Sequence, residues 1–134
     1  MVVDTSALLA ILLDEPESLR CADALEIVPA AFLSAASRVE LDIVVVNKLG
    51  DEALSDVDDL IDVAGIQVEP VTSAHWVLAR QAYLAFGKGR GHPAQLNFGD
   101  CFSYALAKEL QMPLLFVGKD FSATDITAVL TSNA

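Results

Sequence analysis

Four carboxylates stand where an apolar strand is expected to stop or a helix to begin: Asp4, Glu40, Asp100 and Asp120. In a parallel sheet, such strand ends share one rim. Two carboxylates about 4 Å apart repel by roughly 4 kcal/mol at an effective dielectric constant of about 20. A hard cation offsets this repulsion, and Mg²⁺ prefers one or two carboxylates, several waters and a substrate phosphate. The four acids therefore predict a divalent-metal site for phosphate chemistry.

Three of these acids also have an ordinary structural interpretation. Asp4 could cap the helix that follows it. Glu40 stands three residues after Ser37, and Asp100 three residues after Asn97. Both spacings are those of capping pairs at helix starts. The metal site and the capping role both remain open for these positions.

Two further sets of residues keep more than one interpretation. Asp120 is either a turn residue or the fourth acid, and Asp125 competes with it for that role. Lys88, Arg90 and His92 lie in a glycine-rich stretch that cannot form a regular element. They are either a solvated loop or a local patch that contacts phosphates.

The length of 134 residues fits one domain, spanning residues 1–134, with a single core. The hydrophobic fraction is high, at 54%, but no apolar run approaches the roughly 18 to 20 residues that cross a bilayer. Met1–Val3 runs straight into Asp4 without the basic region or cleavage site of a signal peptide. We expect a soluble cytoplasmic protein with no membrane contact.

The net charge of −11 argues against a chain that holds nucleic acid through an overall positive potential. Any contact with nucleic acid must therefore be local. The acids gather in Asp14–Glu26 and Asp51–Asp62, which we interpret as solvated helix faces beside which a basic partner could bind. Cys21 and Cys101 lack the spacing of a zinc site or a disulfide framework, so we expect buried reduced thiols.

Apolar strands and amphipathic helices are expected to alternate along the chain. Glycine at positions 50 and 65 and proline at position 113 mark helix ends, and the stretch from Gly87 to Pro93 is expected to be a mobile loop. This alternation predicts an α/β fold, a three-layer α/β/α sandwich with a mostly parallel central sheet. The expected strands are Met1–Val3, Ala30–Leu33, Ile66–Val71 and Leu114–Val117, and the expected helices are Thr5–Leu13, Pro16–Ile27, Ser34–Leu49, Asp51–Ala64, Ser73–Phe86 and Asn97–Leu110.

Six stretches of the chain carry motifs of one known family: Asp4–Leu8, Ser34–Glu40, Gly87–Arg90, Leu96–Ala107, Leu114–Phe121 and Thr124–Ile126. Together they resemble a PIN-domain ribonuclease of the VapC type, the toxin of a toxin-antitoxin pair. The resemblance covers almost the whole chain in family order, which makes it far more specific than any one motif. It implies a single PIN-like domain.

The resemblance implies an endoribonuclease that depends on Mg²⁺ or Mn²⁺. It also implies a VapB-type antitoxin as inhibitor and assembly as a homodimer or a toxin-antitoxin hetero-oligomer. By matched position, Asp4, Glu40 and Asp100 take the roles of acidic site residues, and Ser6 matches a hydroxyl that orients the cluster. Asp120 matches less closely, because this chain has Lys119 in a turn where related chains vary, which leaves the fourth ligand open.

The mechanism that we expect is metal-assisted hydrolysis of an RNA phosphodiester. Asp4 and Asp100 would be the primary metal ligands. Glu40 and Asp120 would bind through water, complete a second metal position or accept the proton of the attacking water. The choice between one and two metals is open, and so is the identity of the RNA, although unpaired RNA suits a narrow acidic pocket.

Three other protein classes share parts of this pattern. A phosphoacceptor receiver domain would need an acceptor Asp after a central strand, but Thr72 and Ser73 follow Ile66–Val71. A haloacid-dehalogenase-type phosphatase would need a second acid two residues after Asp4, where Ser6 stands. A protein-interaction module without metal chemistry is the non-enzymatic alternative, with solvated acids and apolar helix faces devoted to a partner.

Overall fold

The computed structural model describes residues 1–131. At its centre is a parallel sheet with the strand order β3-β2-β1-β4. The strands are β1 Val2–Val3, β2 Ala31–Ser34, β3 Ile66–Glu69 and β4 Leu114–Leu115. In the register of the sheet, Val2 lies opposite Phe32 on one side and Leu114 on the other. The first strand of the chain is therefore central in the sheet.

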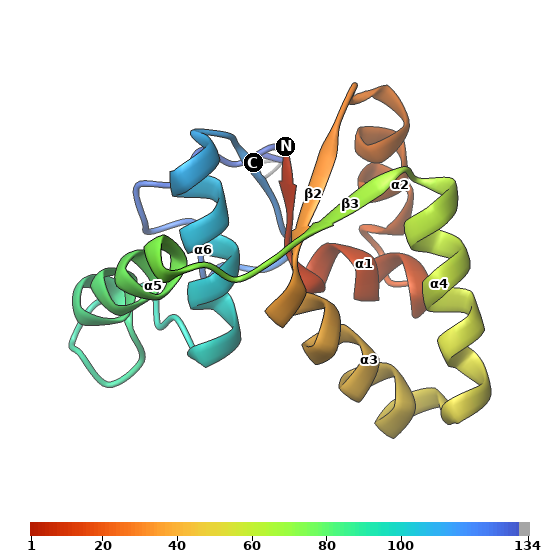
Figure 1. The fold of residues 1–134 in the computed structure, drawn as a ribbon, viewed down its shortest axis with the longest axis horizontal. Helices are drawn as coiled ribbons and strands as arrows, with labels where there is room; N and C mark the ends of the chain where they lie inside the picture. Colours follow the sequence, from red (N-terminus) through yellow and green to blue (C-terminus); the bar gives the residue numbers. More distant parts are fainter. Residues whose placement is uncertain (132–134) are drawn as a thin grey trace.

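Helices cover both faces of this sheet, as Figure 1 shows. The core is split accordingly, because Val3 packs with the helices α1 to α4 and Val2 packs with α5 and α6. The predicted three-layer sandwich is confirmed, and its sheet is entirely parallel. The helices are α1 Thr5–Leu12, α2 Ser18–Ile27, α3 Ala35–Leu49, a 3₁₀ turn Asp51–Ala53, α4 Leu54–Val63, α5 Ser73–Phe86 and α6 Phe98–Leu110.

Burial of the two cysteines follows the same division. Cys21 belongs to the cluster under α1 to α4, and Cys101 to the cluster under α5 and α6. Both thiols are free and buried, as expected. Among residues 1–131, no helix combines the length and the apolar character that crossing a membrane requires.

Element boundaries differ from the sequence predictions where backbone groups find other partners. β4 ends at Leu115 rather than Val117, and the Val117 N–H donates to Ser6 Oγ at 3.0 Å instead of to a strand. β3 ends at Glu69 because Pro70 has no N–H to continue the ladder. The second helix begins at Ser18, two residues after the predicted Pro16.

The carboxyl ends of the strands form the rim that the sequence analysis singled out. Asp4 follows β1 directly, and its N–H donates to Leu115 O at 2.9 Å, so the end of β1 lies beside the end of β4. Ser34 ends β2 and accepts from the Ala36 N–H as the N-cap of α3. The rim therefore carries the start of α1, the start of α3 and the turn after β4.

Candidate active site

Asp4 is held at the rim by hydrogen bonds to both of its carboxylate oxygens. Its side chain is buried, with 4% of the residue exposed. Oδ2 accepts from the N–H of Ser6 at 3.1 Å and from Ser6 Oγ at 2.7 Å, while Oδ1 accepts from Ser103 Oγ at 2.6 Å. Asp4 therefore caps α1, and the same bonds fix its carboxylate toward α6. The structural and the chemical interpretations of this residue are compatible.

Asp100 also combines a cap with a place in the acidic cluster. The Asn97 N–H donates to Asp100 Oδ2 at 3.0 Å and the Asp100 N–H donates to Asn97 Oδ1 at 2.9 Å, which is a complete capping box. Burial raises the pKa of Asp100 to about 7, against the opposing bond from Asn97. The negative charges of Asp4, Asp120 and Glu40, in that order, raise the pKa of Asp100 further. Asp4, Asp120 and Glu40 therefore all lie within electrostatic reach of Asp100.

Glu40 approaches the same region from α3. The N-cap of this helix is Ser34, so the capping pair considered for Ser37 and Glu40 is wrong. The Glu40 carboxylate lies against the first turn of α6, where a Cβ atom added to Gly99 would be 1.9 Å from Glu40 Oε2. Burial raises the pKa of Glu40, and the Asp4 charge adds to this effect while the Thr5 hydroxyl opposes it.

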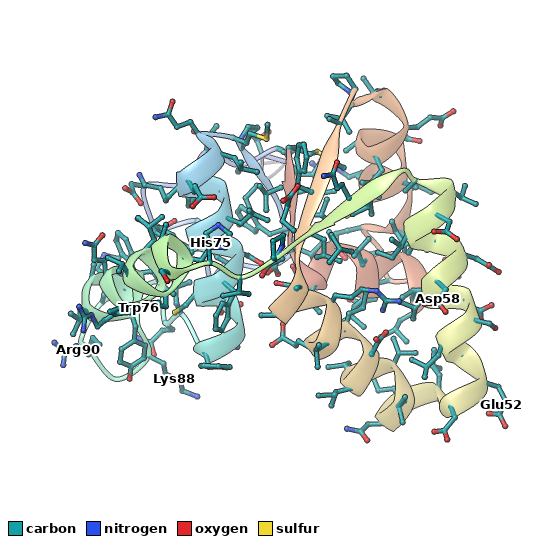
Figure 2. The ribbon with its side chains drawn as sticks, viewed as in Figure 1. Glu52, Asp58, His75, Trp76, Lys88 and Arg90 are labelled. Atoms are coloured by element: carbon teal, nitrogen blue, oxygen red, sulfur yellow. The ribbon has the colours of Figure 1, made fainter. Side chains whose placement is uncertain are left out.

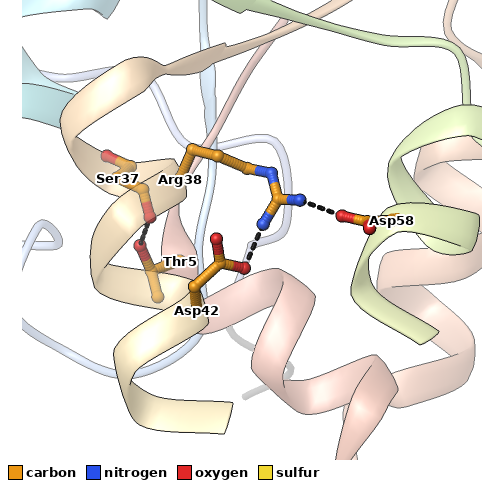
Figure 3. Close-up of polar contacts among 5 residues, drawn as sticks. All are labelled: Thr5, Ser37, Arg38, Asp42 and Asp58. Atoms are coloured by element: carbon orange, nitrogen blue, oxygen red, sulfur yellow. Dashed lines mark hydrogen bonds and ion pairs between the residues drawn. The ribbon is translucent and has the colours of Figure 1, made fainter. Parts of the chain in front are cut away.

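Contacts of α3 with α1 and α4 place Glu40 in this position. The Thr5 hydroxyl donates to Ser37 O at 3.3 Å, which joins α1 to α3. Arg38 forms ion pairs with Asp42 on its own helix and with Asp58 on α4. Figure 3 shows these contacts on successive turns of α3. The helix is therefore attached on both sides close to the residue that carries the carboxylate.

The two candidates for the fourth acid have different surroundings. Asp125 Oδ1 accepts from Tyr104 Oη at 2.7 Å and Oδ2 accepts from Lys108 Nζ at 2.8 Å. Burial alone would raise the pKa of Asp125, but these bonds outweigh burial and lower the pKa. Asp120 is exposed in the turn after β4, and its charge raises the pKa of Asp100. The charge of Asp120, rather than that of Asp125, therefore acts on Asp100, and the role of Asp120 as the fourth acid stays a prediction.

The basic loop residues divide into two kinds. Lys88 and Arg90 are exposed and, within residues 1–131, take part in no ion pair. His92 is half-buried, because its ring meets Phe86 edge-on at 5.0 Å and its Nδ1 accepts from the Ala94 N–H at 3.1 Å. A contact between His92 and a ligand would therefore fall to Nε2.

Buried hydroxyls form a supporting layer that the sequence analysis did not single out. Ser103 is 1% exposed, donates to Asp4 and lies 3.3 Å from the hydroxyl of Ser37, which is equally buried. Ser103 follows Asp100 by three residues and so lies near the same helix face. That spacing was the available signal, but a serine in an apolar helix is common enough that the spacing alone predicted nothing.

The donor set fits a hard divalent cation that keeps part of its water. Among residues 1–131, no three acidic, histidine or cysteine side chains converge closely enough to enclose a metal ion as they stand. Within the same range, none of the four acids takes part in an ion pair. Mg²⁺ binds through one or two carboxylates plus waters rather than in an all-protein cage. Asp4 and Asp100 could hold such an ion, with Glu40 and Asp120 around it.

The sequence pattern of the PIN domain family matches residues 1–126 of the chain. This chain is a PIN-domain protein. Curated relatives place it among the VapC ribonucleases. It is 48% identical over 130 residues to VapC ribonuclease Mb0625 of Mycobacterium bovis, covering 97% of this chain and 98% of the relative. It is 44% identical over 129 residues to Ribonuclease VapC of Mycolicibacterium smegmatis, covering 96% and 99%.

Solved structures of PIN-domain proteins support the fold. The structure of Mycobacterium tuberculosis VapC20, described as a sarcin-ricin loop cleaving toxin, matches with a TM-score of 0.75 at 20% identity and covers 96% of this chain and 97% of that chain. FitAcB from Neisseria gonorrhoeae matches with a TM-score of 0.66 at 20% identity, covering 95% and 94%. The predicted family and fold class are confirmed, and the receiver-domain and phosphatase alternatives are set aside.

Proposed function

We propose that this VapC-type PIN domain is a divalent-metal-dependent endoribonuclease that acts as the toxin of a toxin-antitoxin pair. The observation that carries the proposal is the acidic cluster at the sheet rim, in which burial and neighbouring carboxylates raise the pKa of Asp100 to about 7. An uncompensated cluster of this kind is costly unless a cation binds. Its donors are all oxygens, which suit Mg²⁺ or Mn²⁺.

In the proposed mechanism each acid has a separate role. When bound, a divalent cation supplies Lewis acidity to the phosphodiester and acidifies water at neutral pH. Asp4 and Asp100 hold the cation, and the hydroxyls of Ser6 and Ser103 fix the orientation of Asp4. Glu40 is positioned to take up a proton, because its raised pKa makes it a stronger base than an ordinary glutamate.

RNA is the proposed substrate, and the proposal explains how an acidic chain could approach it. The cation reverses the sign of the charge inside the pocket. Lys88 and Arg90, which are exposed in the loop after α5, supply local positive charge for the phosphate backbone, with His92 as a further candidate contact. Asp120 lies in the turn on the rim and completes the acidic set.

The proposed inhibitor is a VapB-type antitoxin, and the proposed assembly is a homodimer or a toxin-antitoxin hetero-oligomer. A cavity of about 530 Å³ lies between α1, α2 and α4, with Ile11, Leu25 and Leu60 in its lining. Val63, which also lines it, is 88% exposed. A cavity with a largely apolar lining beside the acidic helix α4 suits an apolar segment of a basic partner.

The decisive experiment compares cleavage of a mixed RNA pool by the wild-type protein, by Asp100→Asn and by the matched control Asp59→Asn. Asp59 is exposed on α4, whereas Asn at position 100 keeps an oxygen that can accept the capping bond from Asn97. Each protein is freed of antitoxin by unfolding and refolding and assayed with Mg²⁺, Mn²⁺ or EDTA.

We expect metal-dependent cleavage by the wild type and by Asp59→Asn, and a loss of at least about 100-fold in Asp100→Asn. Cleavage that persists in EDTA would contradict the metal dependence. Equal cleavage by all three proteins would place the activity outside this site.

A further inference from the structure

One segment of this strongly acidic chain contains no acid at all. Residues 73–99, which form α5 and the loop that leads to α6, include no Asp or Glu. They carry Arg80, Lys88 and Arg90, which gives the segment a net charge of +3 against −14 for the rest of the chain. In Figure 2, Lys88 and Arg90 lie near Trp76 at one end of the molecule, and Glu52 and Asp58 lie at the opposite end.

A cavity between α5 and α6 opens in this basic region. Its volume is about 370 Å³, within the range of roughly 300 to 1,000 Å³ typical of small-ligand pockets. Three of its aromatic side chains are largely exposed, Phe98 by 80%, Trp76 by 50% and Tyr83 by 42%. Aromatic side chains exposed to this extent around one cavity mark an interaction site. The lining consists of Trp76, Ala79, Arg80, Tyr83, Phe98, Cys101 and Phe102.

The side chains around the cavity are already ordered by one another. The Arg80 guanidinium lies over the Trp76 ring at 4.8 Å from its centroid. Phe98 and Phe102 meet edge to face with centroids 5.0 Å apart. The Tyr83 hydroxyl donates to Lys88 O at 3.0 Å, which fixes the start of the basic loop beside the cavity. Aromatic faces and the Arg80 guanidinium therefore share one opening, and the basic loop starts beside it.

We propose that this cavity binds a nucleobase of the RNA substrate, stacked on Trp76, Tyr83 or Phe98, while Arg80, Lys88 and Arg90 contact the adjacent phosphates. The proposal rests on the proposed ribonuclease function. Aromatic platforms beside cations are how proteins bind unpaired nucleic acid, because every base has a flat face that can stack. A purely hydrophobic partner would not account for the clustering of basic residues at the same opening.

The cavity lies close to the acidic cluster but on another face of α6. Phe98, Cys101 and Phe102 come from the first turns of α6, the same part of the helix that carries Asp100. Asp100 points toward the other acids, whereas the lining residues face α5. The stacked base therefore belongs to a nucleotide that flanks the cleaved linkage, and the cavity would contribute to the sequence preference of cleavage.

A second copy of the chain is the competing occupant of this surface. A two-fold symmetric contact brings the same patch of both subunits together. At this cavity it would bring Arg80, Lys88 and Arg90 of one copy close to the same cations of the other, and like charges in an interface are unfavourable. The charge of the surface therefore favours RNA, and self-association becomes an outcome of the test.

The chain carries its own probe of the cavity, because Trp76 is its single tryptophan. We would titrate the full chain in EDTA, at low salt, with a short unpaired RNA and with an abasic oligonucleotide of equal length and charge. Trp76 emission and the anisotropy of a dye on the RNA would be recorded together. Stacking predicts that the RNA quenches Trp76 and that the abasic strand does not.

The variant Phe98→Ala removes one stacking surface, and Leu84→Ala is its matched control. Leu84 is 54% exposed on α5 and does not line the cavity, so both truncations remove an exposed apolar side chain. We expect Phe98→Ala to weaken binding of the base-bearing RNA by roughly 5- to 150-fold, the cost of one lost stack. Leu84→Ala should bind as the wild type does. Circular dichroism would confirm that both variants are folded.

Three results would overturn the inference. Equal quenching by the abasic strand would show that only phosphates bind. Unchanged binding by Phe98→Ala, together with Trp76 emission that the RNA does not change, would show that the cavity is not used. Sedimentation showing a wild-type dimer that Phe98→Ala dissociates, without quenching by RNA, would assign the surface to a second copy. Metal-dependent cleavage by the wild type measures the proposed function separately, so either proposal can fail while the other holds.

Discussion

At the scale of single residues, Asp100 shows how one side chain serves the fold and the site together. Its Oδ2 completes the capping box of α6, and its burial beside Asp4, Asp120 and Glu40 raises its pKa to about 7. The capping bond keeps the carboxylate at a position where other charges disfavour its ionised form. The proposed metal ligand is therefore also the residue that caps α6. Ionisation of this carboxylate lowers the stability of the folded protein, because the neighbouring charges disfavour the ionised form.

A pH dependence of stability follows from this pKa. The pKa of Asp100 is about 7 in the folded protein and near the ordinary 3.8 in the unfolded chain. Its contribution to stability is therefore fully present below about pH 4 and is lost as the pH rises through about 7. The variant Asp100→Asn has no ionisable side chain at this position. We therefore expect its free energy of unfolding in EDTA to rise relative to that of the wild type as the pH rises from about 5 to about 8. Urea unfolding measures both free energies. If their difference does not change with pH, the raised pKa is contradicted.

Gly99 provides a second test at this scale. A Cβ at position 99 would lie 1.9 Å from Glu40 Oε2, so Gly99→Ala must displace the Glu40 carboxylate. Alanine is the better helix former by up to about 1 kcal/mol, so the fold should not weaken. We expect RNA cleavage to fall to the level of Glu40→Gln, and the double variant to be no slower, because both changes remove one contribution. Full activity of Gly99→Ala in a metal-dependent cleavage assay would show that Glu40 does not act from this position.

At the scale of elements, the site depends on how α1, α3 and α6 are fixed around the end of β1. α6 is joined to Asp4 through Ser103, and α3 is joined to α1 through Thr5 and Ser37. The surface ion pair from Arg38 to Asp58 adds a link to α4. Leu41, next to Glu40, is completely buried in the core cluster under α1 to α4. Burial and ion pairing both hold α3, but with very different strengths.

We predict that Leu41→Ala lowers the free energy of unfolding by roughly 2 to 5 kcal/mol, because it removes buried atoms and leaves a cavity. Asp58→Asn should lower it by less than about 1 kcal/mol, since the Asp58 side chain is 65% exposed and solvent screens the pair. Urea unfolding of both variants measures this contrast, and the effect of Asp58→Asn should shrink further at high salt. A comparable cost for the two variants would mean that the ion pair, rather than the core, positions α3.

At the scale of the whole molecule, charge is separated along the chain and in space. The acids concentrate in residues 14–26, on α4 and in the turn between α3 and α4, while residues 73–99 carry none. The sheet rim lies between these regions, with its own four acids. A polyanionic substrate would therefore approach from the side of α5 and its loop, where repulsion is weakest. In the proposed assembly, the cavity between α1, α2 and α4 is left for a partner of the opposite charge.

Much of this arrangement could be predicted from the sequence. All four strands were predicted close to their observed positions, because short apolar runs bounded by proline, glycine and capping residues mark where a strand can lie. The errors fall at ends, such as Val117, whose N–H bonds Ser6 instead of extending β4. Such ends are decided by a distant hydroxyl, which local patterns do not contain.

The sequence by itself determined the alternation of strands and helices, the separation of charge and the places of Asp4, Asp100 and Asp120 at element ends, because these depend on neighbouring residues. Glu40 was expected at such an end as well, but it lies in the second turn of α3. Only the tertiary structure decided that Ser103 bonds Asp4 across 99 positions, that Glu40 lies against Gly99, and that Asp120 rather than Asp125 adds its charge to the cluster. Contacts of this kind depend on how helices cross over a twisted sheet, and that geometry follows from the packing of the whole core rather than from any local run of residues.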